Sequence, residues 1–94
     1  MDIRRVIVSE NAEDDLRKIP EYITLKLQSW IESVSVNGIL YVRKIRGFHD
    51  EPLQGKRKGQ RSIRLSRSYR AIYVVRENRK VEFIEILEVN KHVY

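Results

Sequence analysis

An α+β domain of two layers is predicted by the sequence: a short N-terminal strand, a helical hairpin, and an antiparallel meander of three strands, with the helices on one face of the sheet. Two observations lead to this fold class. Apolar residues recur at helical spacing between residues 10 and 37, whereas they alternate with polar residues between residues 61 and 76. Since 94 residues can bury one core of this kind but not two, we expect a single domain over residues 1–94.

The first strand is predicted over residues 3–8, IRRVIV, and Ser9 after it is a good N-cap for a helix. Acidic residues between positions 10 and 15 load the start of that helix with negative charge. Arg17 and Lys18 end it with positive charge, which is the arrangement that the helix dipole favours. The first helix of the hairpin is therefore short and strongly polar on its outer side.

A second helix is predicted from Pro20, which suits a first helical turn, to Asn37 and Gly38, which can stop it. One stripe at 3.6-residue spacing is expected to be buried: Ile23, Leu27, Trp30, Ile31 and Val34. Aromatic residues at core-facing positions are expected to join this core: Trp30, Tyr41, Tyr69 and Tyr73.

The second half of the chain is predicted to hold a basic loop and the meander. Residues 39–60 are irregular and rich in glycine, with a short strand expected near residues 41–45. Period-two alternation then indicates two strands joined by a tight turn near residues 66–68. A second turn is expected at residues 76–80, before a last strand at 81–89.

Positive charge is concentrated in one part of the chain. Residues 43–70 contain ten Lys or Arg against Asp50 and Glu51, a net charge of +8 within a chain whose net charge is +6. This distribution favours a polyanionic ligand, because neutralising phosphates and releasing their counterions supplies affinity. A tight turn brings Arg70 close to Arg64 and its neighbours on the preceding strand. The sequence thus predicts a positive floor for nucleic acid or for an acidic protein partner.

Several kinds of chemistry lack the residues that they need. The chain has no cysteine, and its two histidines, His49 and His92, do not stand at metal-ligand spacing. The sequence contains neither a Gly-x-Ser-x-Gly elbow nor a phosphate-binding glycine loop. No stretch has the length and apolar character of a bilayer span or a signal peptide. We therefore expect no metal, no cofactor, no membrane partner and a cytoplasmic location.

Acid–base chemistry on RNA remains, because RNA carries its own nucleophile in the 2′-hydroxyl group. Cleavage needs a base for the hydroxyl proton, cations for the charge that grows on the phosphorane, and an acid for the leaving 5′-oxygen. The candidates are Glu51 or His49 as the base, Arg64 and Arg70 as the cations, and His92 with Tyr94 at the C-terminus. These residues fill the three roles if the C-terminus returns to the sheet.

Two stretches resemble the RelE/ParE superfamily of bacterial toxin–antitoxin toxins, in particular its ribonuclease branches RelE, YoeB and HigB: EPLQGKRKGQRSIRLSRSYRAIYVV and EVNKHVY. The shared features are the PLQG loop, the glycine before the basic strand GQRSIRL, the YR-x-x-Y strand, and the terminal His and Tyr. The resemblance covers the last half of the chain. The β-α-α-β-β-β order extends it over the whole, as one RelE-like toxin domain.

This resemblance implies an mRNA endonuclease that usually acts in the ribosomal A site and is kept inactive by a cognate antitoxin. Glu51 resembles the general base of YoeB-like members, and Arg64 matches a basic position on the floor of the RelE-like cleft. Arg70, in YRAIY, matches the phosphate-binding arginine. His92 resembles the general acid, and Tyr94 resembles the terminal aromatic residue that stacks on a base.

The sequence departs from these relatives at two places. One residue separates His92 from Tyr94, where the YoeB-like ending is contiguous, and Ser62 stands where RelE-like members have a lysine. Further RNA contacts are expected from basic residues near the site: Lys56, Arg57, Lys58, Arg61 and Lys91.

Two other functions stay open at this point. ParE-like members of the same superfamily are thought to inhibit DNA gyrase without cleaving RNA, and they share the fold. A simple nucleic-acid-binding module would keep the positive floor and need neither Glu51 nor His92. The terminal HVY and the dense arginines favour the nuclease. We therefore expect a metal-independent endoribonuclease whose partners are mRNA, the ribosome and an antitoxin.

Overall fold

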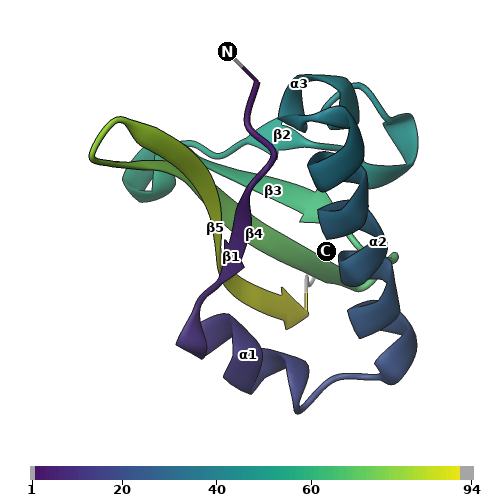
Figure 1. The fold of residues 1–94 in the computed structure, drawn as a ribbon. Helices are drawn as coiled ribbons and strands as arrows, with labels where there is room; N and C mark the ends of the chain where they lie inside the picture. The colour runs from purple at the N-terminus through teal and green to yellow at the C-terminus, as the bar shows by residue number, and fades with distance from the viewer. Residues whose placement is uncertain (1, 92–94) are drawn as a thin grey trace.

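Within residues 2–91, which this computed structural model describes, five strands form one sheet (Figure 1). In chain order they are β1 (Val6–Val8), β2 (Glu51–Pro52), β3 (Gln60–Arg64), β4 (Tyr69–Asn78) and β5 (Val81–Lys91). Their order across the sheet is β1-β5-β4-β3-β2, with β1 parallel to β5 and the other pairs antiparallel. The predicted meander is confirmed as β3–β4–β5, and the short strand β2, which the sequence did not predict, extends it.

The α-helices of the described chain are α1 (Glu10–Leu16), α2 (Glu21–Asn37) and the single turn α3 (Ile39–Val42), and two short 3-10 helices follow, η1 (Arg46–Phe48) and η2 (Gly55–Arg57). The long helix α2 lies across one face of the sheet, and α1 lies beside β5 (Figure 1). Ser9 caps α1 as predicted, because its side-chain oxygen accepts a hydrogen bond from the Ala12 amide at 3.1 Å. The two-layer α+β class is therefore confirmed. None of these helices combines the length and apolar character needed to cross a bilayer.

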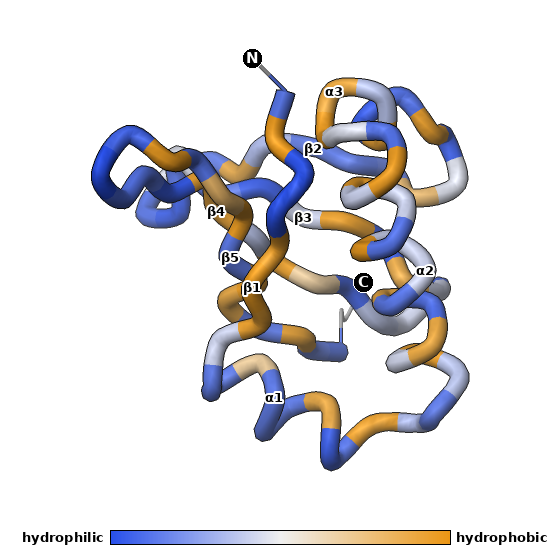
Figure 2. The backbone as a smooth tube through the Cα atoms, in the orientation of Figure 1, coloured by the Kyte–Doolittle hydropathy of each residue, from blue (hydrophilic) through white to orange (hydrophobic). Residues whose placement is uncertain are grey.

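The core lies between α2 and the sheet. Four residues of the predicted stripe are fully buried: Ile23, Leu27, Trp30 and Val34. The Trp30 ring packs against Tyr73 of β4, with the ring centroids 5.1 Å apart. Apolar residues of the neighbouring strand β5, Ile84 and Ile86, are buried in the same core. Figure 2 shows apolar segments along both α2 and the strands.

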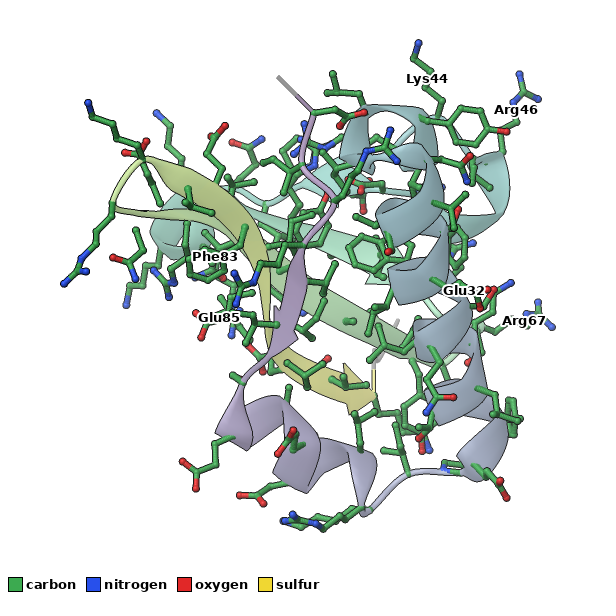
Figure 3. The ribbon with its side chains drawn as sticks, in the orientation of Figure 1. Glu32, Lys44, Arg46, Arg67, Phe83 and Glu85 are labelled. Atoms are coloured by element: carbon green, nitrogen blue, oxygen red, sulfur yellow. The ribbon has the colours of Figure 1, made fainter. Side chains whose placement is uncertain are left out.

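The second face of the sheet points away from this core, and we call it the open face. Its residues on β3, β4 and β5 are Gln60, Ser62, Arg64, Arg70, Ile72, Val74, Arg76, Asn78, Val81, Phe83, Glu85, Glu88 and Asn90. Figure 3 shows the labelled Phe83 and Glu85 on the side of the sheet away from α2. The helices thus leave this face to strand residues and to the loop that precedes β3.

The prediction of a strand near residues 41–45 was wrong, because the chain forms the helical turn α3 there. Burial in α3 follows helical spacing, with Ile39 and Val42 buried and the residues between them exposed. Tyr41, which was expected in the core, is one of those exposed residues, at 58%. A segment of only four residues carries too little periodicity to distinguish a helical turn from a strand.

The turn between β4 and β5 is shorter than expected. Strand β4 continues to Asn78 and β5 begins at Val81, so only Arg79 and Lys80 form the turn. Both have positive φ, 51° and 68°, which two-residue hairpin turns require. The longer strands extend the sheet beyond the core.

Gly38 joins α2 to α3 in a conformation that other residues avoid, with φ 86° and ψ 157°. A Cβ atom there would lie 2.0 Å from Oδ2 of Asp2, whose Oδ1 accepts a hydrogen bond from the Leu40 amide at 3.0 Å. Gly38→Ala should therefore lower the free energy of unfolding by about 1 to 3 kcal/mol. Gly47→Ala is the matched control, because a Cβ atom at that position would have no other atom within 4 Å. Chemical denaturation measures both, and equal stability of the two variants would contradict the role of Gly38.

Candidate functional site

Strand register places three of the five predicted catalytic residues on the open face. In antiparallel pairs, residues directly opposite each other project from the same face of the sheet. One row across the sheet is Glu51, Ser62, Ile72 and Glu88, and the next row is Arg64, Arg70 and Asn90. The two rows are one pleat repeat apart, about 6 to 7 Å. The structure therefore brings Glu51, Arg64 and Arg70 onto one surface, although the sequence had placed only Arg64 and Arg70 on strands and Glu51 in a loop.

Arg64 and Arg70 lie directly opposite each other on neighbouring strands. Arg64 is exposed and Arg70 is half-buried, and no carboxylate in residues 2–91 forms a salt bridge with either side chain. The Nε of Arg70 donates to Oδ1 of Asn90 at 3.2 Å, which fixes the direction of the guanidinium group. Like charges directly opposite each other destabilise a sheet. A pair of this kind is typical of a surface that binds an anion.

Glu51 stands at the β2 edge of the open face, beside a second candidate for the base. Its Oε2 lies 3.5 Å from Nε2 of His49, and both side chains are more than half exposed. His49 has a positive φ of 47°, a conformation that turns the chain sharply just before β2. The two groups proposed from the sequence as alternative bases therefore lie side by side at this edge of the sheet.

Asp50 lies between these two residues, and its completely buried side chain points to the opposite side. Its Oδ1 accepts from Nε of Arg61 at 2.6 Å, and its Oδ2 accepts from the hydroxyl of Tyr73 at 2.6 Å. Nε of Arg43 in turn donates to the Tyr73 hydroxyl at 3.3 Å. Burial raises the pKa of Tyr73, and the hydrogen bond to Asp50 raises it further, so the phenol stays a donor. This network holds the loop that carries His49 and Glu51.

Arg61 was predicted as an RNA contact, but its side chain belongs to this network on the α2 side of the sheet. Sequence reasoning missed Asp50 as an anchor. The single signal available was that Asp50 is one of two acidic residues in an otherwise basic segment. Alternation along β3 gives Arg61 and Arg64 opposite faces, because they are separated by an odd number of positions.

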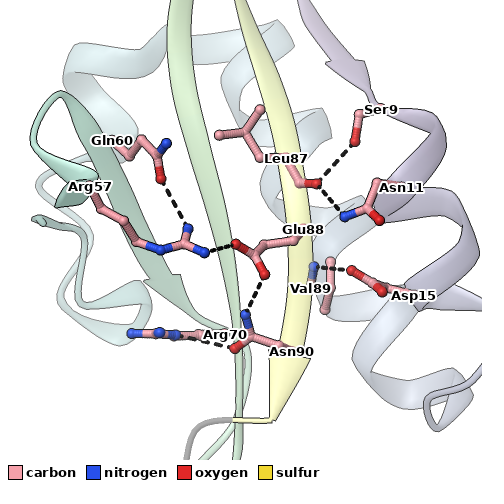
Figure 4. A network of polar contacts seen from close by, with 10 residues as sticks. All are labelled: Ser9, Asn11, Asp15, Arg57, Gln60, Arg70, Leu87, Glu88, Val89 and Asn90. Atoms are coloured by element: carbon pink, nitrogen blue, oxygen red, sulfur yellow. Dashed lines mark hydrogen bonds and ion pairs between the residues drawn. The ribbon is translucent and has the colours of Figure 1, made fainter.

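Arg57 is also engaged, within a network that runs across the open face (Figure 4). Its guanidinium pairs with Oε1 of Glu88 and donates to Oε1 of Gln60 at 3.0 Å. Oε2 of Glu88 accepts from Nδ2 of Asn90 at 3.0 Å, and Asn90 leads on to Arg70. Glu88 and Asn90 were not predicted as site residues. The pattern of β5 gave one hint, because its glutamates interrupt the apolar alternation.

A β-bulge in β5 turns Glu88 onto the open face. Ile86 lies opposite Tyr73 and Glu88 lies opposite Ile72, so Leu87 has no residue opposite it. In a regular strand, residue 88 would face the core as Ile86 does, because residues two positions apart share a face. The extra residue therefore decides which face of the sheet receives this carboxylate.

Helix α1 holds the bulge in place (Figure 4). The carbonyl oxygen of Leu87 accepts hydrogen bonds from Oγ of Ser9 at 3.1 Å and Nδ2 of Asn11 at 3.2 Å. The amide of Val89 donates to Oδ2 of Asp15 at 3.0 Å. Side chains of α1 and of its N-cap residue thus bond the backbone groups on both sides of Glu88.

Of the other predicted residues, three are exposed lysines and two lie outside the described chain. Lys56, Lys58 and Lys91 are exposed. His92 and Tyr94 lie outside the described residues. Between positions 2 and 91, no three side chains of the metal-binding types gather into a cluster.

A family model described as the ParE toxin of type II toxin–antitoxin systems, parDE, matches residues 6–92. The chain belongs to this ParE toxin family. The resemblance to the RelE/ParE superfamily inferred from the sequence is therefore confirmed, and the protein is a toxin of a type II toxin–antitoxin system. A search of curated proteins gave no match.

Solved toxin structures share the fold of this ParE-family chain. The YoeB/ParE toxin from Agrobacterium tumefaciens is 17% identical with a TM-score of 0.67, over 95% of this chain and 99% of that one. YafQ from E. coli is 19% identical with a TM-score of 0.68, over 95% and 93%. A chain of the YoeB–YefM complex from Staphylococcus aureus is 22% identical with a TM-score of 0.67, over 95% and 97%. At these identities the likeness establishes the fold.

Proposed function

We propose that this toxin is an endoribonuclease that cleaves mRNA, in the ribosomal A site, by attack of the RNA's own 2′-hydroxyl. The observation that carries the proposal is the Arg64–Arg70 pair, which no described carboxylate neutralises, on the same face as Glu51. A phosphodiester held there meets two cations and one carboxylate. These positions resemble those of the ribonuclease branches of the superfamily, which supports the same function.

The reaction requires three groups and no metal. Glu51 takes the proton from the 2′-hydroxyl as the 2′-oxygen forms its bond to phosphorus. Arg70 and Arg64 stabilise the negative charge that grows on the phosphorane oxygens. The bond to the 5′-oxygen then breaks, and His92 gives that oxygen a proton, leaving a 2′,3′-cyclic phosphate and a 5′-hydroxyl. Tyr94 stacks on a base beside the scissile bond.

RNA outside the scissile bond is bound by the exposed lysines of the predicted set: Lys56, Lys58 and Lys91. Arg61 contributes indirectly, because it holds Asp50 and through it the loop of Glu51. A flexible lysine contacts phosphate without fixed geometry, so these residues serve binding more than catalysis.

A cognate antitoxin is the second partner that we propose. Apposed arginines attract an acidic segment as well as RNA, so an antitoxin that covers the open face blocks the site. Solved relatives include the YoeB–YefM complex and the E. coli DinJ–YafQ toxin–antitoxin complex, which supports this expectation.

Inhibition of DNA gyrase is the alternative, and the match to the ParE family model favours it. In that case the open face would bind protein or DNA, and Glu51 would have no chemical role. The two functions differ in product, because only the nuclease leaves cut mRNA.

Wild-type toxin should cut ribosome-bound mRNA and leave gyrase supercoiling unchanged. The same mRNA with a 2′-deoxy nucleotide at the scissile position should bind the ribosome and stay intact, because the nucleophile has been removed. End-labelled mRNA on sequencing gels and a plasmid supercoiling assay measure the two activities. Cleavage of the deoxy substrate would refute the mechanism, and inhibited supercoiling with intact mRNA would establish the gyrase alternative.

A further inference from the structure

On the open face, the guanidinium group of Arg57 already forms an ion pair with a carboxylate of the protein itself, that of Glu88. Arg57 leaves the loop before β3 and reaches Glu88 on β5, so its side chain crosses β4. Ile72 of β4, directly opposite Glu88, is fully buried although it is outside the core cluster. An apolar floor of this kind strengthens the polar contacts above it, because it excludes water from one side.

Glu88 sits where an external anion would be bound. One carboxylate oxygen is held by the guanidinium of Arg57 and the other by the amide of Asn90, so two donors from different segments converge on it. Both charged side chains remain partly accessible, 43% for Arg57 and 24% for Glu88. An anion from solution can therefore reach this position once the carboxylate turns outward.

The position is continuous with the proposed catalytic pair. Asn90 contacts Glu88 through its amide nitrogen and Arg70 through its amide oxygen. The rows of Glu88 and Arg70 are neighbours, about 6 to 7 Å apart along the strands. One RNA strand lying along the face can thus place one phosphate at Arg70 and a neighbouring phosphate at Arg57.

We propose that Arg57 and Asn90 form a second phosphate subsite, which Glu88 fills in the unbound protein and which RNA takes by displacing Glu88. The ligand class rests on the proposed function, because it assumes that the open face binds RNA. Partly exposed ion pairs are weak, so the carboxylate competes with RNA without preventing its binding. Glu88 therefore keeps isolated anions out of the subsite, because only an RNA strand that is also bound at Arg70 displaces its carboxylate.

Glu88→Gln is the direct test, because the amide keeps the shape of the side chain and loses its charge. The probe is a fluorescein-labelled 2′-O-methyl RNA dodecamer, which binds without being cleaved, followed by anisotropy at several salt concentrations. Glu88→Gln should tighten binding up to about fivefold. It should also steepen the salt dependence by about 0.7, the value for one more phosphate contact on a single strand.

Glu85→Gln is the matched control. Glu85 lies on the same strand and the same face and pairs with Nε of Arg76 at 2.7 Å, with the same exposure, 25% against 24%. The Glu85→Gln variant therefore removes the same charge from a position that lacks the contact with Asn90. Its effect on affinity should be clearly smaller, with an unchanged salt slope. Equal effects of the two variants would overturn the subsite, because they would reflect net charge alone.

Arg57→Ala identifies the residue that gains the phosphate. It should weaken binding little in the wild-type background and abolish the gain in the Glu88→Gln background. A gain that persists without Arg57 would contradict the proposal. Cleavage by wild type is measured alongside: RNA binding with the Glu88 effect but no cleavage supports the subsite and refutes the nuclease. Cleavage of ribosome-bound mRNA without the Glu88 effect does the reverse. Absence of binding to the dodecamer overturns the subsite, and the nuclease is then decided by the cleavage assay alone.

Discussion

Replacing Arg70 with alanine should lower the single-turnover rate of mRNA cleavage by about 10² to 10³. Arg70 is half-buried on a strand flanked on both sides, and its Nε is held by Asn90 at 3.2 Å, so its guanidinium is oriented before the substrate arrives. Such a donor stabilises charge that develops only in the transition state. Ribosome affinity should change much less than the rate. Arg70→Lys keeps the charge but loses the planar fork, so it should recover little of the rate.

Arg67→Ala is the control for this loss of charge. Arg67 is exposed beyond the end of β3, in the turn before β4, and is visible at the surface in Figure 3. Its loss should weaken ribosome binding slightly and leave the rate of the bound complex unchanged. The pair is measured in single-turnover cleavage and ribosome binding at two salt concentrations. If Arg70→Ala cleaves as wild type does, Arg70 does not stabilise the transition state, and the catalytic role proposed for it is wrong.

Replacing Asp50 with alanine should lower the free energy of unfolding by about 3 kcal/mol. The carboxylate is completely buried and accepts from both Arg61 and Tyr73, so its removal leaves two donors without their acceptor. Asp50→Asn should cost less, because the amide oxygen can still accept one of the two bonds. Chemical denaturation measures both variants.

Asp14→Ala is the matched control for an ion pair without burial. Asp14 pairs with Arg17 one turn away at 2.5 Å, and the two side chains are 55% and 72% exposed. Its loss should change stability by no more than about 0.5 kcal/mol. If Asp50→Ala were as mild as this control, the buried network would not hold the loop of Glu51, and another contact would have to position that residue.

Much of the fold follows from local patterns. The stripe of α2, the cap at Ser9 and the alternation along β3 and β4 were predicted because each depends on residues close together in the chain. The segment at residues 41–45 was mispredicted because its conformation depends on residues far away in the chain. Gly38 is held against the N-terminal segment through Asp2 and Leu40, and this long-range contact starts the turn of α3.

The candidate site divides in the same way. The sequence alone determined that positive charge gathers between residues 43 and 70, and that Arg64 and Arg70 meet across a tight turn, since turn length and period-two alternation set both. Tertiary structure decided which other basic side chains remain available. Arg61 is taken by Asp50 from a loop, and Arg57 by Glu88 from a strand far along the chain. Glu88 reaches the open face only because the bulge at Leu87, bonded to α1, shifts the alternation of β5 by one residue, and hydrogen bonds between distant segments leave no local pattern.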